Sequence, residues 1–362
     1  MSGIEKRKQN HIRVSLKENV ETDVSTGFQD IRLIHRALPE IDLDEVSTET
    51  IFFGKKLAAP LIISAITGGT RKAAKLNEVL AEVAEEKNIG ISVGSQRIAV
   101  SQPETIPTFS IVREKAPSTF VMGNLGCPQL SLGWGVEEAK KCVEMIEADA
   151  LALHMNPLQE AVQLDGDTNY SGIYEKIRSL QKIKKPLVMK ETGAGIAWED
   201  AVKMEKAGVS GLEVSGVGGT SWSAVEYHIA KELGKKEMEY LGNALWNWGI
   251  PTAISVVETT QKTNLSVISS GGIRTGVDVV KSIALGAELG GLAKPFLEKA
   301  VEGSEQLSDY IDNLIREIKV AMFLVGAKNL DSLSNIPVII MGRTAEWLTL
   351  RGFDPRAYVD RT

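Results

Sequence analysis

Cysteine and histidine are scarce in this chain, which has two cysteines and four histidines among 362 residues. Cys127 and Cys142 are too few for a disulfide framework or a cysteine-rich metal cluster, so we interpret both as small apolar residues. No two histidines stand four positions apart, which excludes the helical pattern of zinc proteases.

The sequence also lacks long apolar runs and long runs of one charge. The net charge of −6 is spread over both signs, which argues against nucleic acid as the main partner. No apolar run approaches the roughly 18 residues of a membrane span, and the polar N-terminus lacks the apolar region of a secretory signal. We therefore expect a cytoplasmic protein that binds neither nucleic acid nor membrane.

Short apolar, β-prone runs alternate with amphipathic stretches from Pro60 onward. We expect strands over residues 61–65, 89–93, 119–123, 150–154, 187–190, 211–215, 266–270 and 289–293. Helical periodicity between them predicts helices over residues 71–87, 136–147, 173–183 and 198–206. This alternation indicates right-handed βαβ units, and eight such units close a (β/α)8 TIM barrel, an α/β fold. An open doubly wound sheet is the weaker alternative, because no complete G-x-G-x-x-G motif follows a strand.

Two segments depart from the repeat and set the domain organisation. Residues 1–49 precede the first strand as an N-terminal arm that begins with basic residues, and residues 50–362 form the barrel. Residues 216–264 form a long insertion after strand six, and residues 296–362 predict extra helices outside the barrel. Barrels with long insertions at the mouth often associate, so we expect a homo-oligomer.

Polar and glycine-rich residues follow all eight predicted strands, where function gathers in a barrel. A single Gly-Gly pair reads as an ordinary turn, but coincidence at eight strand ends is harder to accept. Gly271-Gly272, followed by Arg274 and a helix near Val277, matches the phosphate site that barrels build after strands seven and eight. We therefore expect a bound phosphate, with further donors from Gly218 to Thr220.

Charged residues near the barrel mouth suggest two further roles. Lys190 ends an apolar run and could stabilise negative charge on a flavin ring, although a snorkelling surface lysine is the alternative. Glu160 could bind Mg²⁺ together with substrate phosphate, although a lone glutamate at a helix start is more often a helix-dipole partner. Arg7, Lys8 and His11 form the basic cluster of the arm, for which a solvated terminus is the alternative.

These motifs together resemble those of the type 2 isopentenyl diphosphate isomerases, which use FMN. Ser-Gln-Arg, His-x-Asn-Pro-x-Gln-Glu and Gly-Gly-Thr-x-Trp are specific in combination, whereas Gly-Gly-Ile-Arg is shared by many FMN barrels. The matches follow the family's order and comprise Arg7-Lys8 with His11, Thr67 to Gly69, Ser95 to Arg97, Asn124 to Gly126, His154 to Glu160, Lys190-Glu191, Gly218 to Trp222 and Gly271 to Arg274.

The resemblance implies interconversion of isopentenyl and dimethylallyl diphosphate in isoprenoid biosynthesis, with reduced FMN, Mg²⁺ and NADPH as the reductant. It implies that the flavin itself moves protons, with Lys190, His154 and Gln159 as catalytic residues and Glu160 as the metal ligand. The implied FMN-binding residues are Ile66, Thr67, Gly68, Ser95, Asn124, Lys190, Ser215, Thr220, Gly271, Gly272, Ile273, Arg274, Ala293 and Lys294. The implied substrate-binding residues are Arg7, Lys8, His11, Ser95, Gln96, Arg97, His154, Asn156 and Gln159.

Two other readings of the sequence remain. One is another FMN barrel, such as a 2-hydroxy-acid oxidase or a nucleotide dehydrogenase. The latter would need a loop cysteine as nucleophile, and neither cysteine fits that role well. The other is a barrel that binds a phosphorylated ligand without catalysis. Substrate turnover by the reduced protein separates all three readings.

Overall fold

A closed barrel of eight parallel strands forms the centre of the computed structural model, which describes residues 3–361 and side chains from residue 7. Each strand pairs with its sequence neighbours, and the last strand closes on the first through Gly290 and Leu61. The strands are β4 (Leu61–Ile63), β5 (Gly90–Ser92), β6 (Val121–Gly126), β7 (Ala150–His154), β8 (Leu187–Lys190), β9 (Gly211–Glu213), β10 (Ser266–Ser270) and β11 (Leu289–Leu292). The predicted TIM barrel and its eight strands are confirmed.

The strands lie between two layers of apolar side chains, which explains their continuous apolar sequences. Side chains such as Ile62, Met122 and Val188 fill the barrel interior, whereas Ile63 and Val121 pack toward the outer helices. The outer helices are α2 (Arg71–Lys87), α4 (Pro107–Lys115), α6 (Val136–Glu144), α8 (Ile173–Ser179), α9 (Trp198–Lys206), α12 (Thr252–Lys262), α13 (Gly276–Ala284), α14 (Lys294–Glu302) and α15 (Ser304–Leu324). None of the helices described between residues 3 and 361 is long and apolar enough to cross a membrane.

Shorter helices sit largely at the carboxyl ends of the strands. They are α3 (Arg97–Ser101), α5 (Cys127–Ser131) and α7 (Pro157–Val162). The insertion after β9 contributes α10 (Trp222–Glu232) and α11 (Lys236–Ala244) before the chain returns to the barrel through α12. The insertion therefore brings two extra helices to the mouth of the barrel.

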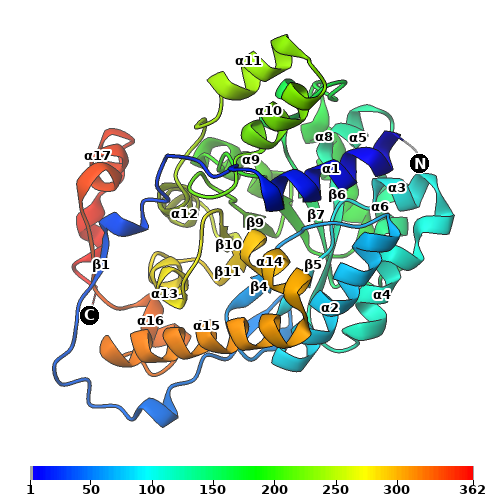
Figure 1. The fold of residues 1–362 in the computed structure, drawn as a ribbon. Coiled ribbons are helices and arrows are strands. Elements are labelled where there is room, and N and C mark those ends of the chain that lie inside the picture. The colour runs from blue at the N-terminus through cyan, green and yellow to red at the C-terminus, as the bar shows by residue number, and fades with distance from the viewer. Residues whose placement is uncertain (1–2, 362) are drawn as a thin grey trace.

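The N-terminal segment spans the molecule and is more structured than the sequence indicates. Helix α1 (Gly3–Lys17) packs against α10, and β1 (Ile31–Leu33) pairs antiparallel with β12 (Val338–Ile340) near the C-terminus. Figure 1 shows this course, with β1 beside α17 (Gly342–Leu350) and α16 (Leu330–Ser334) nearby. The hairpin of β2 (Thr50–Phe52) and β3 (Lys55–Leu57) then packs Phe52 and Leu57 among the side chains of the barrel interior.

Candidate active site

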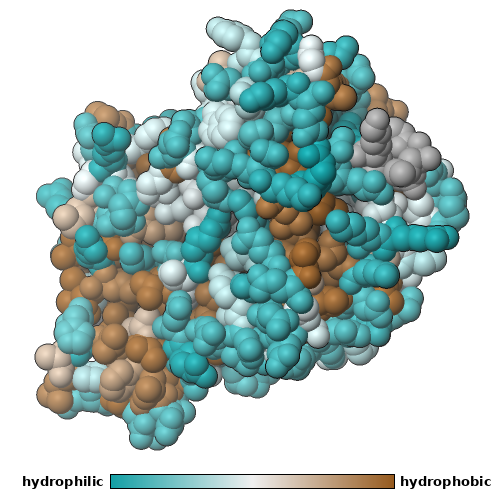
Figure 2. Space-filling view, in the orientation of Figure 1, coloured by the Kyte–Doolittle hydropathy of each residue, from teal (hydrophilic) through white to brown (hydrophobic). Residues whose placement is uncertain are grey.

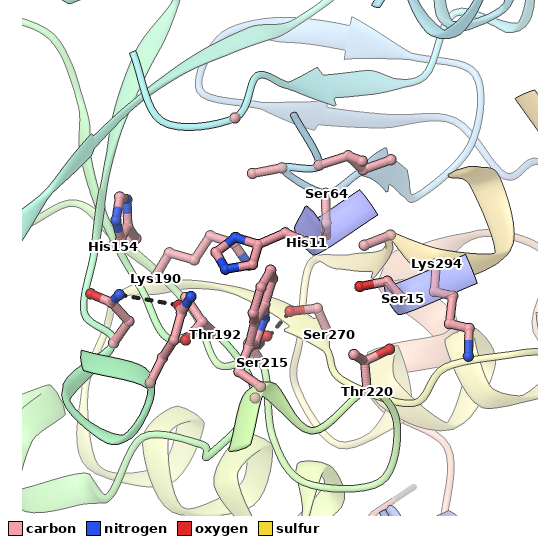
Figure 3. A pocket seen from close by; sticks show the side chains of 18 of the residues that line it. His11, Ser15, Ser64, His154, Lys190, Thr192, Ser215, Thr220, Ser270 and Lys294 are labelled. Carbon is pink, nitrogen blue, oxygen red and sulfur yellow. Dashed lines mark hydrogen bonds between the residues drawn. The ribbon is translucent and has the colours of Figure 1, made fainter. Parts of the chain in front are cut away.

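A cavity opens at the carboxyl ends of the barrel strands, where this fold places its function. Every barrel strand contributes lining residues at or just after its carboxyl end, and α1 adds residues from the arm. In Figure 3, His154 and Lys190 lie on one side of the cavity, Thr220 and Lys294 on the other, and Ser270 between them. Segments that are far apart in the sequence thus meet around one space.

Most of the residues predicted as site residues line this cavity. They are Arg7, Lys8, His11, Ile66, Thr67, Ser95, Arg97, Asn124, His154, Asn156, Gln159, Glu160, Lys190, Ser215, Thr220, Gly271, Gly272, Ile273, Arg274, Ala293 and Lys294. The structure brings these residues together around one space.

Gln96 and Gly68 do not line the cavity. The Gln96 side chain is fully buried, where it accepts a hydrogen bond from the Asn124 N–H (2.7 Å) and donates one to the Cys142 carbonyl (2.8 Å). Its position favours a structural link between neighbouring strand ends over contact with a substrate. Gly68 lies against Phe109, which a Cβ at Gly68 would approach to 2.0 Å, and its carbonyl accepts a hydrogen bond from Lys8.

One end of the cavity is built like a phosphate site. Gly271 has φ of 101° and packs so closely that a Cβ there would lie 2.1 Å from the Gly216 carbonyl oxygen. Helix α14 begins at Lys294, beside this turn, and directs its positive N-terminal end toward the cavity. Arg274 adds a guanidinium to the same lining. This combination of close backbone, helix N-terminus and cations is typical of phosphate binding.

A carboxylate of the arm binds both cations at that end. The Glu21 carboxylate lies 2.9 Å from Arg274 Nη2 and 2.6 Å from Lys294 Nζ, yet Glu21 itself does not line the cavity. The backbone next to Glu21 is also bonded to the loop that contains Gly219, because the Thr22 N–H donates to the Gly219 carbonyl (2.9 Å). The sequence analysis did not identify Glu21.

A buried ion pair lies deeper in the cavity. Lys190 Nζ donates to Glu213 Oε1 (2.6 Å), which also accepts hydrogen bonds from the hydroxyls of Ser64 (2.7 Å) and Ser270 (3.1 Å). Glu213 is fully buried, and Lys190 is 6% exposed. The sequence places Lys190 correctly at a strand end but does not reveal Glu213, which reads as the last residue of an ordinary strand.

His154 sits next to this pair in an environment that disfavours its charged form. Burial, and secondarily the charges of Lys190 and Lys8, lower the pKa of His154 to about 4. Its Nδ1 lies 2.7 Å from Asn124 Oδ1. Since that amide oxygen can only accept, Nδ1 carries the proton and Nε2 is an acceptor in the neutral ring.

Glu160 lies at the centre of a polar network on α7. Its carboxylate accepts hydrogen bonds from the Asn156 side chain (2.9 Å), the Gln163 side chain (3.2 Å) and the Asp167 N–H (2.7 Å). Among the side chains described between residues 7 and 361, no three His, Cys, Asp or Glu residues gather so as to hold a metal ion. Glu160 is therefore a single, well-oriented carboxylate at the edge of the cavity.

Glu226 of α10 joins the arm to α7. Its Oε1 lies 2.9 Å from His11 Nε2 and 3.3 Å from Gln159 Nε2, and the residue is 3% exposed. His11 also packs edge-on against Trp222, with ring centroids 5.1 Å apart. The sequence analysis missed Glu226 because a glutamate inside a helix carries no local signal of burial.

Lys8 reaches from the arm into the cavity, and among the side chains described from residue 7 onward it has no carboxylate partner. Its Nζ donates to the carbonyls of Gly68 and Ser95, each at 2.9 Å, and lies 5.3 Å from the centre of the Phe109 ring. Burial, followed by repulsion from Arg7, lowers the pKa of Lys8 to about 7. A desolvated ammonium of this kind is suited to binding an anion.

Comparisons with known proteins agree with this arrangement. Residues 137–338 match the family described as FMN-dependent dehydrogenase. The chain is 45% identical to isopentenyl-diphosphate delta-isomerase of Methanosarcina barkeri, over 99% of this chain and 98% of the relative. It is 47% identical to the enzyme of that name from Pyrococcus furiosus, over 95% and 89% of the two chains.

The chain belongs to the isopentenyl-diphosphate delta-isomerase family. The match to FMN-dependent dehydrogenases identifies the flavin-dependent, type 2 branch of this family, so the chain is an FMN-dependent isomerase. A further member, from Methanothermobacter thermautotrophicus, is 44% identical and covers 99% of this chain and 100% of its own length. The resemblance inferred from the sequence motifs is thus confirmed.

Solved structures of other enzymes share the fold of this isomerase. A mandelate oxidase variant with an FMN adduct has a TM-score of 0.61 and 18% identity, and the match covers 94% of this chain and 99% of that one. A flavocytochrome b2 variant with benzoylformate has a TM-score of 0.61 and 20% identity, covering 90% and 77%. At this level of identity the likeness shows the common barrel alone.

Proposed function

We propose that this chain interconverts isopentenyl diphosphate and dimethylallyl diphosphate in isoprenoid biosynthesis, with reduced FMN and Mg²⁺ as cofactors and NADPH as the reductant. The observation that carries the proposal is one cavity lined by two groups of cationic residues from different parts of the chain. Gly271, Arg274 and Lys294 form one region, and Arg7 and Lys8 of the arm belong to the other. Such a cavity suits a phosphate-bearing cofactor beside a diphosphate substrate.

The residues present fit FMN. The turn at Gly271 leaves no room for a side chain, as a phosphate cradle requires, and α14 adds its N-terminal end. Short hydrogen-bonding side chains, including those of Thr67, Ser95 and Asn124, line the rest of the cavity and suit the polar edge of a flavin ring. Lys190 would place positive charge beside that ring.

The substrate diphosphate would bind at the arm end of the cavity. Arg7, Lys8, His11 and Arg97 supply cationic or titratable groups there, and Asn156 and Gln159 supply amides. Gln159 is held between Asn156 and Glu226, so its amide has a defined direction. Glu160 would hold Mg²⁺, which commonly takes one carboxylate together with phosphate oxygens and waters.

Among the described side chains that line the cavity, the motif residues offer no obvious acid and base pair for moving the two protons of the reaction. His154 is neutral at pH 7 and uses its N–H on Asn124, so it is poorly placed as a general acid. Reduced FMN, when bound, would supply the acid and base chemistry. Lys190 would stabilise negative charge on the cofactor, and His154 and Gln159 would orient the substrate beside it.

Two further predictions concern the whole protein. We propose a cytoplasmic location and assembly into a homo-oligomer, a tetramer or an octamer. The exposed apolar side chains of Leu38, Ile339, Met341 and Leu350 support assembly. Figure 2 shows apolar surface on the side of the molecule where β1 and α17 lie.

An anaerobic assay of the purified protein with FMN, NADPH, Mg²⁺ and isopentenyl diphosphate tests the proposal. We expect dimethylallyl diphosphate to form, with NADPH consumed only to reduce the flavin. NADPH consumption in proportion to product would indicate a dehydrogenase instead. Tight FMN binding without turnover would indicate a barrel that binds its ligand without catalysis.

A further inference from the structure

The Glu213 carboxylate is fixed in an unusual way at the floor of the cavity. It ends β9, and its Oε1 accepts hydrogen bonds from groups on or beside three other strands: Lys190 on β8, Ser64 after β4 and Ser270 on β10. Three donors on one oxygen, at 2.6 to 3.1 Å, leave the side chain no freedom to rotate. The direction of the second oxygen is therefore fixed by the protein.

That second oxygen, Oε2, has no hydrogen-bond partner. Among the described residues, three buried side-chain atoms lack a partner: Ser92 Oγ, Trp198 Nε1 and Glu213 Oε2. Of these three residues, Glu213 alone lines the cavity. An unpaired carboxylate oxygen in a dry site is costly, more so than a neutral group. Because Glu213 is a residue of the cavity lining, a bound ligand is the source of the missing donor that we consider.

The position of Glu213 indicates which part of a bound flavin would carry the missing donor. Glu213 bonds on one side to Lys190, which suits the ring, and on the other to Ser270, which directly precedes the phosphate-site turn at Gly271. In Figure 3, Ser270 likewise lies between Lys190 and the Thr220 and Lys294 side of the cavity. The ribityl chain is the part of FMN that joins ring to phosphate, and its hydroxyls are hydrogen-bond donors.

We propose that Glu213 Oε2 accepts a hydrogen bond from a ribityl hydroxyl of bound FMN. This assignment rests on the proposed function only in taking FMN as the ligand. One carboxylate then connects the ribityl chain, through Oε2, with Lys190, through Oε1. It fixes the lysine relative to the cofactor, and it explains why a buried glutamate stands at a strand end that faces an anionic cofactor.

Binding of three flavins to the Glu213→Gln variant tests the proposal. FMN and riboflavin both carry the ribityl chain, whereas lumiflavin lacks it. We expect the affinity for FMN and for riboflavin to fall by the same factor, about tenfold or more, because a hydrogen bond to a buried charge is lost. Lumiflavin affinity should change less than twofold, since the amide oxygen of glutamine still accepts from Lys190. Flavin fluorescence quenching measures all three affinities.

Two further variants serve as comparisons. Lys190→Met should weaken all three flavins, because Lys190 acts on the ring. Glu160→Gln removes a cavity carboxylate away from the proposed flavin position and should leave all three affinities unchanged. Unchanged melting temperatures of the ligand-free variants, within a few degrees, ensure that the folded site is compared.

Equal losses for the three flavins in Glu213→Gln would overturn the proposal, because Glu213 would then act through the ring or the lysine. Unchanged affinity for FMN and riboflavin would overturn it as well, since another donor would then satisfy Oε2. These outcomes are independent of turnover. A protein that binds flavins as expected but does not convert isopentenyl diphosphate would contradict the proposed function and leave the Glu213 assignment standing.

Discussion

Two basic side chains of the cavity, Lys8 and His154, are held in environments that disfavour their charge. Burial is the largest cause for both, and within the described part of the chain neither has a carboxylate among its hydrogen-bond partners. A diphosphate would supply the missing negative charge and raise both pKa values on binding. Under the proposed function, the burial that disfavours the charge of these residues also makes them selective for an anionic substrate.

The lowered pKa of Lys8 predicts that the affinity for the substrate depends on pH. Its pKa of about 7 means that the free protein loses the Lys8 proton as pH rises above 7, and each further unit makes protonated Lys8 about tenfold rarer. We expect the KM for isopentenyl diphosphate to rise between pH 7 and 9. Lys8→Arg should flatten this profile, because guanidinium stays charged throughout. Lys17→Arg, at the exposed end of α1, is the control, and an identical profile in wild type and Lys8→Arg would contradict the prediction.

The lowered pKa of His154 predicts that the protein loses stability in acid. Its folded pKa of about 4 lies below the ordinary value of 6.5, so the unfolded chain takes up this proton first. The stabilising contribution is complete above pH 6.5 and is lost as pH falls toward 4, by up to about 3 kcal/mol. His154→Gln should therefore make the free energy of unfolding less dependent on pH in this window, as urea titrations measure. Substitution of the exposed His35 by Gln should leave the slope unchanged.

The proposed role of Glu160 predicts that its substitution affects metal binding but not flavin binding. Glu160→Gln keeps an amide oxygen for part of the network around Asn156 but removes the charge that Mg²⁺ requires. We expect Mg²⁺-dependent isomerisation to fall at least a hundredfold, with FMN content unchanged in absorbance spectra. If the variant kept the Mg²⁺ dependence of the wild type, Glu160 would not be the metal ligand.

Helix α1 owes its position to contacts in its C-terminal half and just beyond its C-terminal end. Val14 packs with Val225 of α10, and beyond the helix Glu21 binds Arg274 and Lys294. Because α1 carries Arg7 and Lys8, the pairing of Glu21 holds these cations over the cavity. Under the proposed function, the arm is thus attached at the FMN phosphate end of the site and acts at the diphosphate end.

Removal of this attachment should affect substrate binding more than catalysis. The two ion pairs of Glu21 are partly exposed and are together worth about 1 to 2 kcal/mol. For Glu21→Ala we expect the KM for isopentenyl diphosphate to rise roughly fivefold to tenfold, kcat to change less than twofold, and amide exchange in α1 to accelerate. Asp23→Ala is the matched control, since Asp23 contacts Asn247 and neither cation. A fall in kcat with unchanged KM would contradict this role.

The sequence predicts the barrel elements well because their signals are local. Helices α2 and α9 begin and end as expected, and all eight strands are present. The helix expected over 136–147 ends at Glu144, because Glu147 adopts a left-handed conformation with φ of 44°. The pairing of β1 with β12 joins residues some 300 positions apart in the chain, and strands of three residues carry no local signal of such a distant partner.

The residues of the site also divide into those with a local signal in the sequence and those without one. Motif residues such as Lys190 and Gly271 follow predicted strands, so the barrel geometry brings them together without further information. Glu21, Glu213 and Glu226 could not be found this way, because each acquires its role from a partner distant in the sequence. All three are carboxylates that bind a predicted basic residue or amide of the site. The sequence thus reveals the groups that would contact ligands, and the structure reveals the carboxylates that hold them.

At the scale of the whole molecule, helix α17 is bound to the barrel through Glu258, a buried carboxylate of α12, and this contact supports the N-terminal arm. Glu258 of α12 is fully buried and accepts hydrogen bonds from Arg351 Nε (3.0 Å) and Trp347 Nε1 (3.2 Å), which follow β12 in the chain. Since β12 pairs with β1 of the N-terminal segment, this contact ties both ends of the chain to the barrel.

Loss of the Arg351 guanidinium should therefore destabilise the fold without changing the cofactor site. Arg351→Met would leave Glu258 buried with only part of its hydrogen-bond partners. We expect this to lower the free energy of unfolding by about 2 to 3 kcal/mol. The value is below the full cost of breaking a buried ion pair, because Arg351 is about one-third exposed. FMN affinity should stay within twofold, since neither residue lines the cavity. Urea denaturation measures the loss, and Arg356→Met, whose exposed side chain pairs only with Asp354 among the described residues, is the control. Equal stabilities of the two variants would show that the chain ends are held by the β1–β12 pairing and apolar packing alone.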